Sequence, residues 1–190
     1  VADPDQIASQ IGQFPQVKAA TPRLYASGFL TSGNQSAGAR IVGIDPASAA
    51  NDPYREGVIG GSYIGADDRD SILIGKPMAE KLKLSAGDKV SVSVNTANGD
   101  VLEQAFAITG IYTTNTTSFD SGTVFMPLAK AQAMTQTENH ASAVFILLNN
   151  TADTTAVLAA IPVVPNLKVL DWKELNPLMV DWESMAKSYI

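Results

Sequence analysis

The chain has 190 residues, of which 45% are hydrophobic, and it contains no cysteine. A chain of this length can bury a core without covalent or metal cross-links, and the missing thiols exclude a disulfide framework and a thiolate metal site. Its 19 acidic and 13 basic side chains give a net charge of -6 without a basic cluster, which argues against nucleic acid as a partner.

No apolar run approaches the roughly 18–20 residues that cross a bilayer, so none of this sequence is expected to span a membrane. The sequence opens at Val1, without Met and without a secretion leader, which we interpret as a processed product or an excised piece. The absence of cysteine is compatible with an oxidising compartment.

The first segment is expected to form a helix and two strands. Asp3, Pro4 and Asp5 offer cap and first-turn chemistry for a helix over residues 6–13. The spacing of apolar residues then predicts strands over 24–30 and 39–44, and the polar stretch 33–38 predicts a hairpin turn between them. Residues 45–70 are rich in Gly, Pro, Ser and Asp, so we expect an irregular crossing with one short helix.

The central stretch 72–112 carries the clearest pattern. It predicts a short strand ending at Gly75, a helix of about two turns, and a turn in which Gly87 takes positive φ and Asp88 bonds neighbouring amides. Alternating valines over 90–94 then predict a strand with one polar face, followed by a hairpin into residues 101–112, in which Gly110 helps to close the second strand.

The next residues predict a polar loop over 113–122, a strand over 123–126 and a helix over 127–134. An apolar strand over 143–148, a helix over 152–161 and a final strand over 168–171 would make a β-α-β unit. In the tail, four apolar residues at helical spacing predict a helix over 177–190: Leu178, Trp182, Met185 and Tyr189.

Two patterns in this chain resemble one known family. The first is IxIGxxxAxKLxLxxGDxVxV, starting at Ile72, and the second is FxITGIYxTxxxxFDSGxVFMPLAxAQ, starting at Phe106. Together they resemble the extracytoplasmic domain of ABC transporter permeases of the MacB, FtsX and lipoprotein-releasing (LolC/LolE) type. The turn VGIDP at Val42–Pro46 and the tail LDWKELNPLM at Leu170–Met179 look closest to the lipoprotein-releasing branch.

The resemblance implies an α+β fold with two subdomains. A discontinuous porter-like α/β subdomain would comprise residues 1–48 and 140–176, and a strand-rich, sabre-like subdomain would be inserted over residues 49–139. Residues 177–190 would form a stalk helix towards a transmembrane span. Both ends of the chain are then expected to point to the membrane, and Trp172 and Trp182 to pack between the porter-like subdomain and the tail helix.

The function implied by the resemblance is mechanical. A non-catalytic extracytoplasmic (periplasmic) domain of an inner-membrane or cell-membrane permease would transmit movement driven by a cytoplasmic ABC ATPase, paired with a second copy or a sister subunit. The movement would release or export a hydrophobic cargo such as lipoproteins, with a periplasmic protein as a possible partner. MacB-like efflux and FtsX-like activation of hydrolases stay open, although the short loop over 134–142 shows no chaperone-capturing hook.

The residues themselves show no catalytic constellation. The chain has one histidine, His140, and lacks P-loop, HExxH and GxSxG motifs, so we expect neither an enzyme site, nor a cofactor, nor a metal. SMAK at Ser184–Lys187 lacks the partner motifs of serine acylating enzymes, and Asp67, Asp68 and Asp70 lack the rest of an EF-hand loop. A secreted binding or adhesion module, and more distantly an uncatalogued hydrolase, are the alternatives from other classes.

Contact with a partner or cargo is expected from apolar residues outside the core pattern and from the loop over 113–122. Phe119 lies between polar residues in this loop, where an aromatic ring either anchors on a partner or caps its own hairpin. The other candidates are Asp120 beside it and three residues of the first strand, Tyr25, Phe29 and Leu30. For Tyr25 and Phe29, we favour core packing over contact with a partner, because they alternate along a strand.

Overall fold

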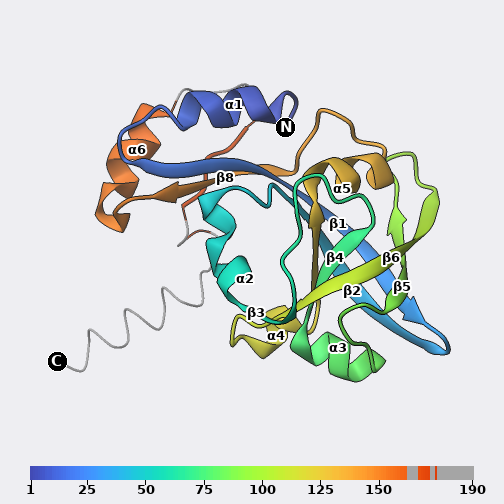
Figure 1. The fold of residues 1–190 in the computed structure, drawn as a ribbon. Coiled ribbons are helices and arrows are strands. Elements are labelled where there is room, and N and C mark those ends of the chain that lie inside the picture. Colours follow the sequence, from blue (N-terminus) through green and yellow to red (C-terminus); the bar gives the residue numbers. More distant parts are fainter. Residues whose placement is uncertain (162–166, 172–173, 175–190) are drawn as a thin grey trace. The chain divides into compact units, whose positions relative to one another are not determined.

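The structure is a computed structural model that describes residues 1–161, 167–171 and 174. It is a mixed α/β protein in which strands dominate (Figure 1), and contacts divide the chain into two units, Val1–Leu147 and Leu148–Ile190. The strands are β1 (Val17–Ser32), β2 (Gln35–Ile44), β3 (Val58–Gly61), β4 (Ser71–Gly75), β5 (Lys89–Asn95), β6 (Val101–Tyr112), β7 (Thr123–Pro127) and β8 (Ala143–Leu148). The helices are α1 (Pro4–Ile11), α2 (Asp52–Glu56), α3 (Lys76–Leu82), α4 (Thr117–Asp120), α5 (Leu128–Thr135) and α6 (Thr154–Ala160), with short 3-10 helices η1 (Ala49–Asn51) and η2 (Thr151–Asp153).

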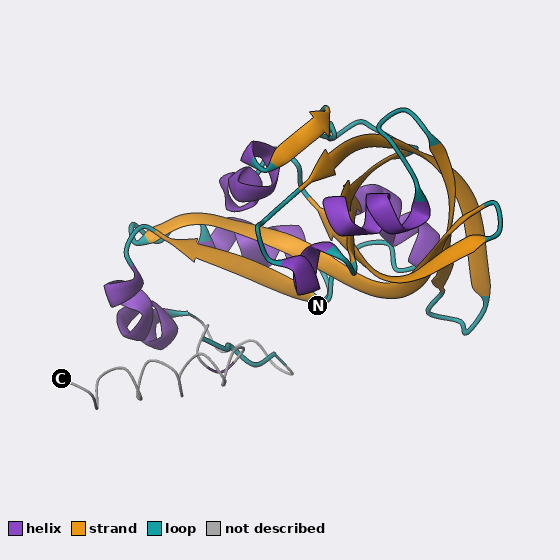
Figure 2. Cartoon of the chain, turned by 90° about the horizontal axis from the view of Figure 1, so that it is seen from below, coloured by secondary structure: helices purple, strands orange, loops and turns teal. Residues whose placement is uncertain are grey.

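Six strands of the first unit close into a ring. They follow the order β2-β7-β4-β6-β5-β1, and β1 pairs back onto β2. Figure 2 shows these strands curving around a common interior. Two of the pairs, β2 with β7 and β4 with β6, are parallel. Because closure leaves no unpaired edge within the ring, only β3 beside β6 and β8 beside β1 retain an edge among the strands of the described residues.

Two apolar clusters lie on opposite faces of the ring. Neighbouring residues in a strand point to opposite faces, and here Ile74 belongs to the interior cluster while Leu73 belongs to the outer one. Val124 and Phe125 divide in the same way. The interior cluster also receives buried side chains from two helices: Met78, Ala79 and Leu82 from α3, and Ala131 and Met134 from α5.

The N-terminal elements confirm the predicted helix and hairpin with changed boundaries. Helix α1 begins two residues early, and Asp3 makes no side-chain cap bond because its φ of 46° and ψ of 50° lie in the left-handed region rather than the extended conformation of a cap. The cap prediction is therefore wrong. The hairpin turn is only Gly33 and Asn34, because β1 and β2 pair from Leu24 opposite Gly43 to Ser32 opposite Gln35.

The crossing over residues 45–70 contains the predicted short helix, α2, and one strand that the sequence did not indicate, β3. The loop over 113–122 likewise contains a short helix, α4. Strands β4 to β8 and helices α3, α5 and α6 confirm the remaining predicted elements up to residue 161, apart from their exact ends.

The predicted final strand over 168–171 is wrong, since residues 167–171 are described and contain no strand. The β-α-β unit therefore lacks its second strand. In the second unit, η2 leads into α6, and Asp171 and Glu174 bond to each other through Glu174 N–H to Asp171 Oδ1 (2.8 Å). The tail helix over 177–190 and both tryptophans lie outside the described residues.

The predicted boundaries between subdomains differ from the division that contacts give. The ring takes β1 and β2 from the predicted porter-like segment and β4 to β7 from the predicted inserted segment, and the first unit continues to Leu147. The division into residues 1–48 with 140–176 and residues 49–139 stays a prediction.

Gly75 supplies the first test. It joins β4 to α3 at a point where a Cβ atom would overlap the main-chain carbonyl of Asp120. We expect Gly75→Ala to lower the free energy of unfolding by about 3 kcal/mol, because two backbone segments must separate to admit one methyl group. Urea unfolding followed by circular dichroism measures this difference.

Gly38 is the matched control, because its nearest neighbour would be a Phe29 ring carbon at 3.9 Å, an ordinary contact. Gly38→Ala should change stability by no more than about 0.5 kcal/mol. Equal losses of unfolding free energy in the two variants would contradict the close approach of Gly75 to the main chain of Asp120.

Candidate functional site

The loop over 113–122 is organised by the buried carboxylate of Asp120, which is 1% exposed. The main-chain N–H of Thr114 donates to Asp120 Oδ2 (2.9 Å), and the hydroxyls of Thr113 and Thr114 donate to Oδ2 and Oδ1 (2.9 and 2.6 Å). These bonds satisfy a charge that would otherwise be costly to bury. Asp120, which was expected to contact a partner or cargo, thus bonds to residues of its own loop.

Phe119 packs into the outer apolar cluster. Its ring stacks on Tyr54 with centroids 6.1 Å apart and planes 8° apart, and the Phe125 ring lies 6.2 Å away. Tyr54 in turn contacts Phe125 at 4.3 Å. The structure therefore shows Phe119 in contact with the chain's own aromatic side chains, and its role as an anchor for a partner stays a prediction.

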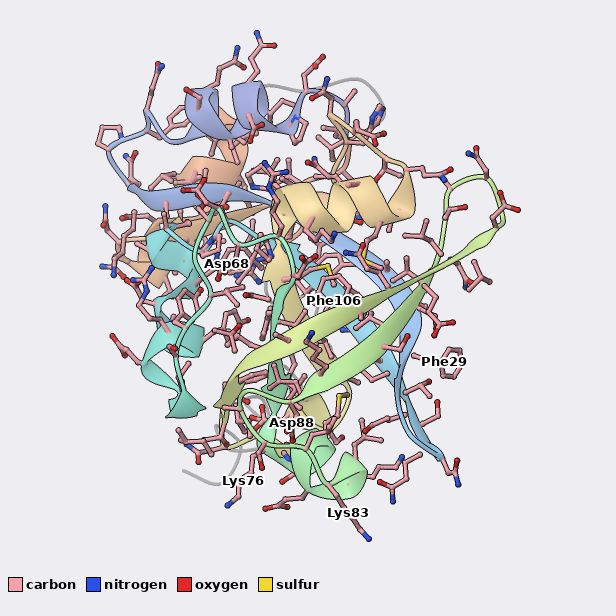
Figure 3. The ribbon with its side chains drawn as sticks, turned by 45° about the vertical axis from the view of Figure 1, so that its right-hand side comes forward. Phe29, Asp68, Lys76, Lys83, Asp88 and Phe106 are labelled. Atoms are coloured by element: carbon pink, nitrogen blue, oxygen red, sulfur yellow. The ribbon has the colours of Figure 1, made fainter. Side chains whose placement is uncertain are left out.

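The three candidates on β1 separate by face. Leu30 is fully buried in the interior cluster, whereas Tyr25 and Phe29 are 44% and 58% exposed on the outer face. The two cross-strand partners of Phe29 are Gly38 and Ser93, which are too small to cover its ring. Figure 3 shows the Phe29 ring pointing away from the body. Core packing, the interpretation favoured from the sequence for Tyr25 and Phe29, is therefore wrong.

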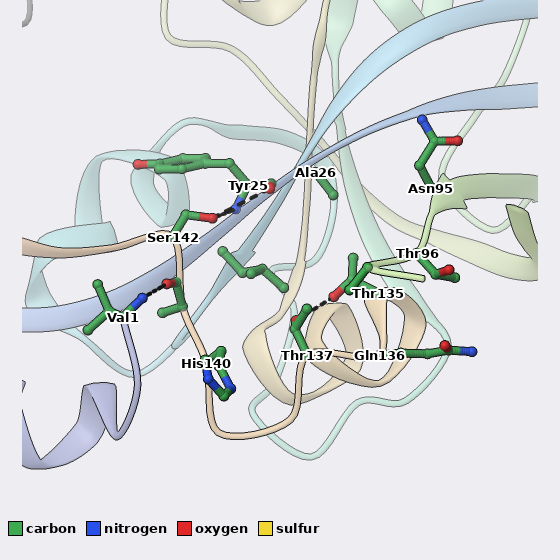
Figure 4. A pocket seen from close by; sticks show the side chains of 13 residues that line it. Val1, Tyr25, Ala26, Asn95, Thr96, Thr135, Gln136, Thr137, His140 and Ser142 are labelled. Carbon is green, nitrogen blue, oxygen red and sulfur yellow. Dashed lines mark hydrogen bonds between the residues drawn. The ribbon is translucent and has the colours of Figure 1, made fainter. Parts of the chain in front are cut away.

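An open pocket of about 560 Å³ lies beside Tyr25 (Figure 4). Ser142 Oγ accepts a hydrogen bond from Tyr25 N–H at 2.9 Å, and the Val1 ammonium donates to the Ala141 carbonyl at 2.8 Å. His140, the chain's one histidine, contacts the Glu138 carbonyl through Nδ1 at 2.9 Å. The pocket lining thus bonds mainly to main-chain groups of this chain.

The turn residues have distinct roles. Gly87 has φ of +96°, as predicted, and Asp88 accepts the Ser85 N–H at 2.8 Å, which confirms the turn before β5. Gly75 ends β4. Gly110 lies inside β6 and pairs with Gly61, so it is a residue of the second strand, as predicted, and not a turn residue.

Among the described residues, no group of three or more His, Asp or Glu side chains is placed to hold a metal. Asp68 accepts the Gly65 N–H at 2.8 Å, and Asp70 accepts from Gln104 Nε2 at 2.8 Å, so both serve the chain itself. Ser184 and Lys187 lie outside the described residues. No helix in the described part of the chain is both long and apolar enough to cross a bilayer.

The sequence did not indicate a buried arginine. Arg23 is 6% exposed, its Nη2 donates to Asn51 Oδ1 at 2.9 Å, and its guanidinium carbon lies 3.9 Å from the centre of the Phe145 ring. One arginine thus joins β1 to the crossing segment and to β8. Arg23 precedes the predicted strand over 24–30, so the sequence offered no signal of its burial.

Two tyrosines near the outer cluster keep their protons more tightly than free tyrosine, whose pKa is about 10. Burial raises the pKa of Tyr63 to about 12. Burial, and then the nearby Asp120 carboxylate, raise the pKa of Tyr112 above its ordinary range. Their hydrogen bonding differs. Tyr112 donates to the Thr123 carbonyl at 3.0 Å, whereas the buried Tyr63 hydroxyl has no partner among the described residues.

Comparison with known proteins identifies a relationship over most of the chain. Residues 1–163 match the family model described as MacB-like periplasmic core domain. The extracellular domain of the noncanonic ABC-type transporter YknZ from Gram-positive bacteria has a similar fold, with a TM-score of 0.60 and 16% identity over 82% of this chain and 78% of that chain. The periplasmic region of MacB from Actinobacillus actinomycetemcomitans has a TM-score of 0.59 and 14% identity over 84% and 73%. A comparison with curated protein sequences finds no match.

The two tyrosines give the second prediction. Tyr112→Phe should lower the free energy of unfolding by about 1 kcal/mol, because the Thr123 carbonyl loses its buried donor. Tyr63→Phe removes a hydroxyl without a partner, so stability should be unchanged or slightly higher. Urea unfolding at neutral pH measures both, and a loss at Tyr63 equal to that at Tyr112 would contradict the assignment.

The raised pKa of Tyr63 also predicts how the stability of the chain changes in alkali. The Tyr63 proton is held to about pH 12 in the folded chain but to about pH 10 in the unfolded chain. The stability that comes from this pKa difference is therefore fully present below about pH 10 and is lost as the pH rises towards 12. Tyr63→Phe should lose less stability than the parent chain between pH 9 and 11.

Proposed function

The chain belongs to the family of MacB-like periplasmic core domains, and from this membership we propose that it is the extracytoplasmic domain of an ABC transporter permease. The observation that carries the proposal is the family match over residues 1–163, and the fold shared with the YknZ and MacB domains supports it. The domain would lie outside the cytoplasm, attached to transmembrane parts of the same permease.

The proposed role is mechanical and non-catalytic. A cytoplasmic ABC ATPase hydrolyses ATP, and the transmembrane parts carry the resulting displacement to this domain and to a second copy or sister subunit. The closed ring supports this role, because close-packed interiors deform little and transmit displacement. The sequence carries no nucleotide-binding motif that would place ATP hydrolysis here.

The cargo proposed first is lipoprotein. The features that favour it are the turn Val42–Pro46 and the tail Leu170–Met179, which resemble the lipoprotein-releasing branch. In the structure, this turn follows β2, with Asp45 Oδ1 accepting the Ala47 N–H at 3.0 Å and the Asp45 carbonyl accepting from Asn51 Nδ2 at 2.7 Å. MacB-like efflux, FtsX-like activation of a cell-wall hydrolase and a secreted adhesion module are the other outcomes.

The mechanical role predicts movement between domains rather than within one. The chain has no cysteine, and Val101 is 67% exposed. A spin label on Val101→Cys is therefore attached at a single site once the rest of the transporter lacks thiols. We expect the distance between labels on the two paired domains to change when ATP or vanadate is added to the reconstituted transporter. Double electron–electron resonance measures this distance.

The control places both labels in one domain, at Ile59→Cys and Val101→Cys, which lie near opposite ends of β6, with an excess of unlabelled transporter. This distance within one domain should not change with ATP. In an ATPase-inactive transporter, the distance between the two domains should not change during incubation with ATP and vanadate. An unaltered distance between domains during full ATP turnover would contradict the mechanical role.

The cargo is tested in cells. Depletion of the transporter should leave lipoproteins in the membrane that contains it, measured by membrane fractionation and immunoblotting, with resistance to exported drugs unchanged. Normal lipoprotein sorting with lost drug resistance would favour efflux, and normal sorting with lost hydrolase activity would favour hydrolase activation. Either result would contradict lipoprotein release while leaving the domain's transporter role intact.

A further inference from the structure

A groove of about 470 Å³ lies between strand β3 and helix α3, away from Tyr25, Phe29 and Phe119. Its apolar lining includes Ile59 of β3, Ile111 of β6 and Leu84, which follows α3. Ile59 is 55% exposed, although it is a large aliphatic residue in a strand. An exposed aliphatic side chain in a groove is a feature of surfaces that meet a partner.

The strand beside this groove has an unpaired edge. β3 pairs with β6, and no second strand within the described part of the chain bonds to β3. The register shifts between Val58 and Gly60, so Ile59 sits at an irregularity of the kind found at sheet edges. Gly60 carries no side chain, and a Cβ there would meet nothing nearer than Ile111 Cβ at 3.9 Å. An approaching backbone therefore meets no obstructing side chain at this position.

The helical side of the groove is positively charged. Lys76 and Lys83 border it, at the start of α3 and just after its end, and Figure 3 shows both at the lower end of the domain. Glu80 is also on this border, but it lies 3.9 Å from Lys76 and offsets only one charge. Residues 76–89 carry four lysines against two acidic residues, whereas the whole chain has a net charge of -6. This segment therefore carries a net positive charge, in contrast to the chain as a whole.

We propose that this groove binds an extended, acidic segment of a partner protein, which adds a strand to the free edge of β3. Main-chain hydrogen bonds to β3 supply the general affinity, as in other cases of strand addition beside a helix. An apolar side chain of the segment packs on Ile59 and Ile111, and flanking carboxylates pair with Lys76 and Lys83. An extended peptide is favoured over a lipid surface because only a peptide can use the edge of a sheet.

This inference names a partner class for the proposed domain and so rests on the proposed function for its biological meaning. Binding itself is measured on the 190-residue chain, whereas transport is measured on the complete transporter. If the chain binds peptides but the domains of the transporter do not move, the proposed function is contradicted and the groove proposal is not. If the domains move but the chain selects no peptide, the groove proposal is contradicted and the proposed function is not.

The experiment selects ten-residue random peptides displayed on phage against the chain and measures the affinity of the enriched peptides by fluorescence anisotropy. We expect sequences in which Asp or Glu alternates with Val, Ile or Leu. Their affinity should fall about tenfold or more for the double variant Lys76→Glu, Lys83→Glu and for Ile59→Asp, because ion pairs and apolar contact are lost. Methylation of a central peptide nitrogen should reduce binding to a similar extent, since it removes a donor to β3.

Two variants serve as matched controls. Lys81→Glu reverses an exposed charge on α3 outside the groove lining, and Val101→Asp places a carboxylate on an exposed apolar position at the other end of β6. Both should bind the peptides as the parent chain does. Circular dichroism of all variants checks that they fold.

Two results would overturn the proposal, and a measurement with vesicles gives one of them a cause. Selection could enrich no peptide, or the enriched peptides could bind the groove variants and the parent chain equally, which would place their site elsewhere. Vesicles of phosphatidylglycerol could bind in a manner that depends on Lys76 and Lys83 while no peptide is enriched, which would assign the charge to a lipid surface.

Discussion

The pairing of β1 with β2 is the constraint on which the rest of the first unit depends. Nine residue pairs, from Leu24 opposite Gly43 to Ser32 opposite Gln35, close the ring of strands. On its other side, β1 pairs with β5 over Gly28–Thr31, and a side chain at Gly28 would overlap the Ser93 carbonyl. Without this hairpin, the sheet would have two open edges and its interior cluster would be exposed to water on one side. Closure therefore sets both the core and the few edges that are left for partners.

The outer apolar cluster of the ring is covered by the crossing segment rather than by a second sheet. Tyr54 of α2 lies against Phe125 of β7 and Phe119 of α4, so one aromatic ring joins three elements. Arg23 secures the same segment through Asn51 and lies over Phe145. A buried guanidinium held by an amide and an aromatic ring is fixed in direction as well as position, since each contact accepts only one face or edge of it. The crossing segment is thereby held to the sheet at two places.

The sequence predicted most elements of this fold because their patterns are local. Val90, Val92 and Val94 alternate with polar residues, so the faces of β5 follow from the sequence alone. β3 has four residues, two of them glycine, and carries too little pattern to be recognised. The apolar residues over 168–171 resemble a strand, but a strand needs a pairing partner that local composition does not specify. The partner of each strand, and hence the closed ring, is also beyond what local pattern determines.

The candidate contact residues show the same limit. A strand pattern places Tyr25 and Phe29 on one face, but it does not show that the residues opposite Phe29 are Gly38 and Ser93, too small to cover it. Phe119 stands between polar residues, and its stacking on Tyr54 depends on a contact between distant segments. The aromatic residue that looked most like an anchor is thus partly buried against the chain's own outer apolar cluster. Ile59, the exposed aliphatic residue of the groove, lies in the crossing over residues 45–70, where the sequence showed no pattern.

Helix α3 connects the core to this groove. Met78, Ala79 and Leu82 are buried in the interior cluster, and their helical spacing leaves Lys76 and Lys83 on the surface at opposite ends of the helix. Because the buried stripe fixes the rotation of α3, it also fixes where the two lysines stand relative to β3. A partner strand bonded to β3 would join the same hydrogen-bonded sheet as β6 and, through β6, the closed ring. A displacement of the ring would then reach the partner through main-chain bonds, without any loop that could absorb it.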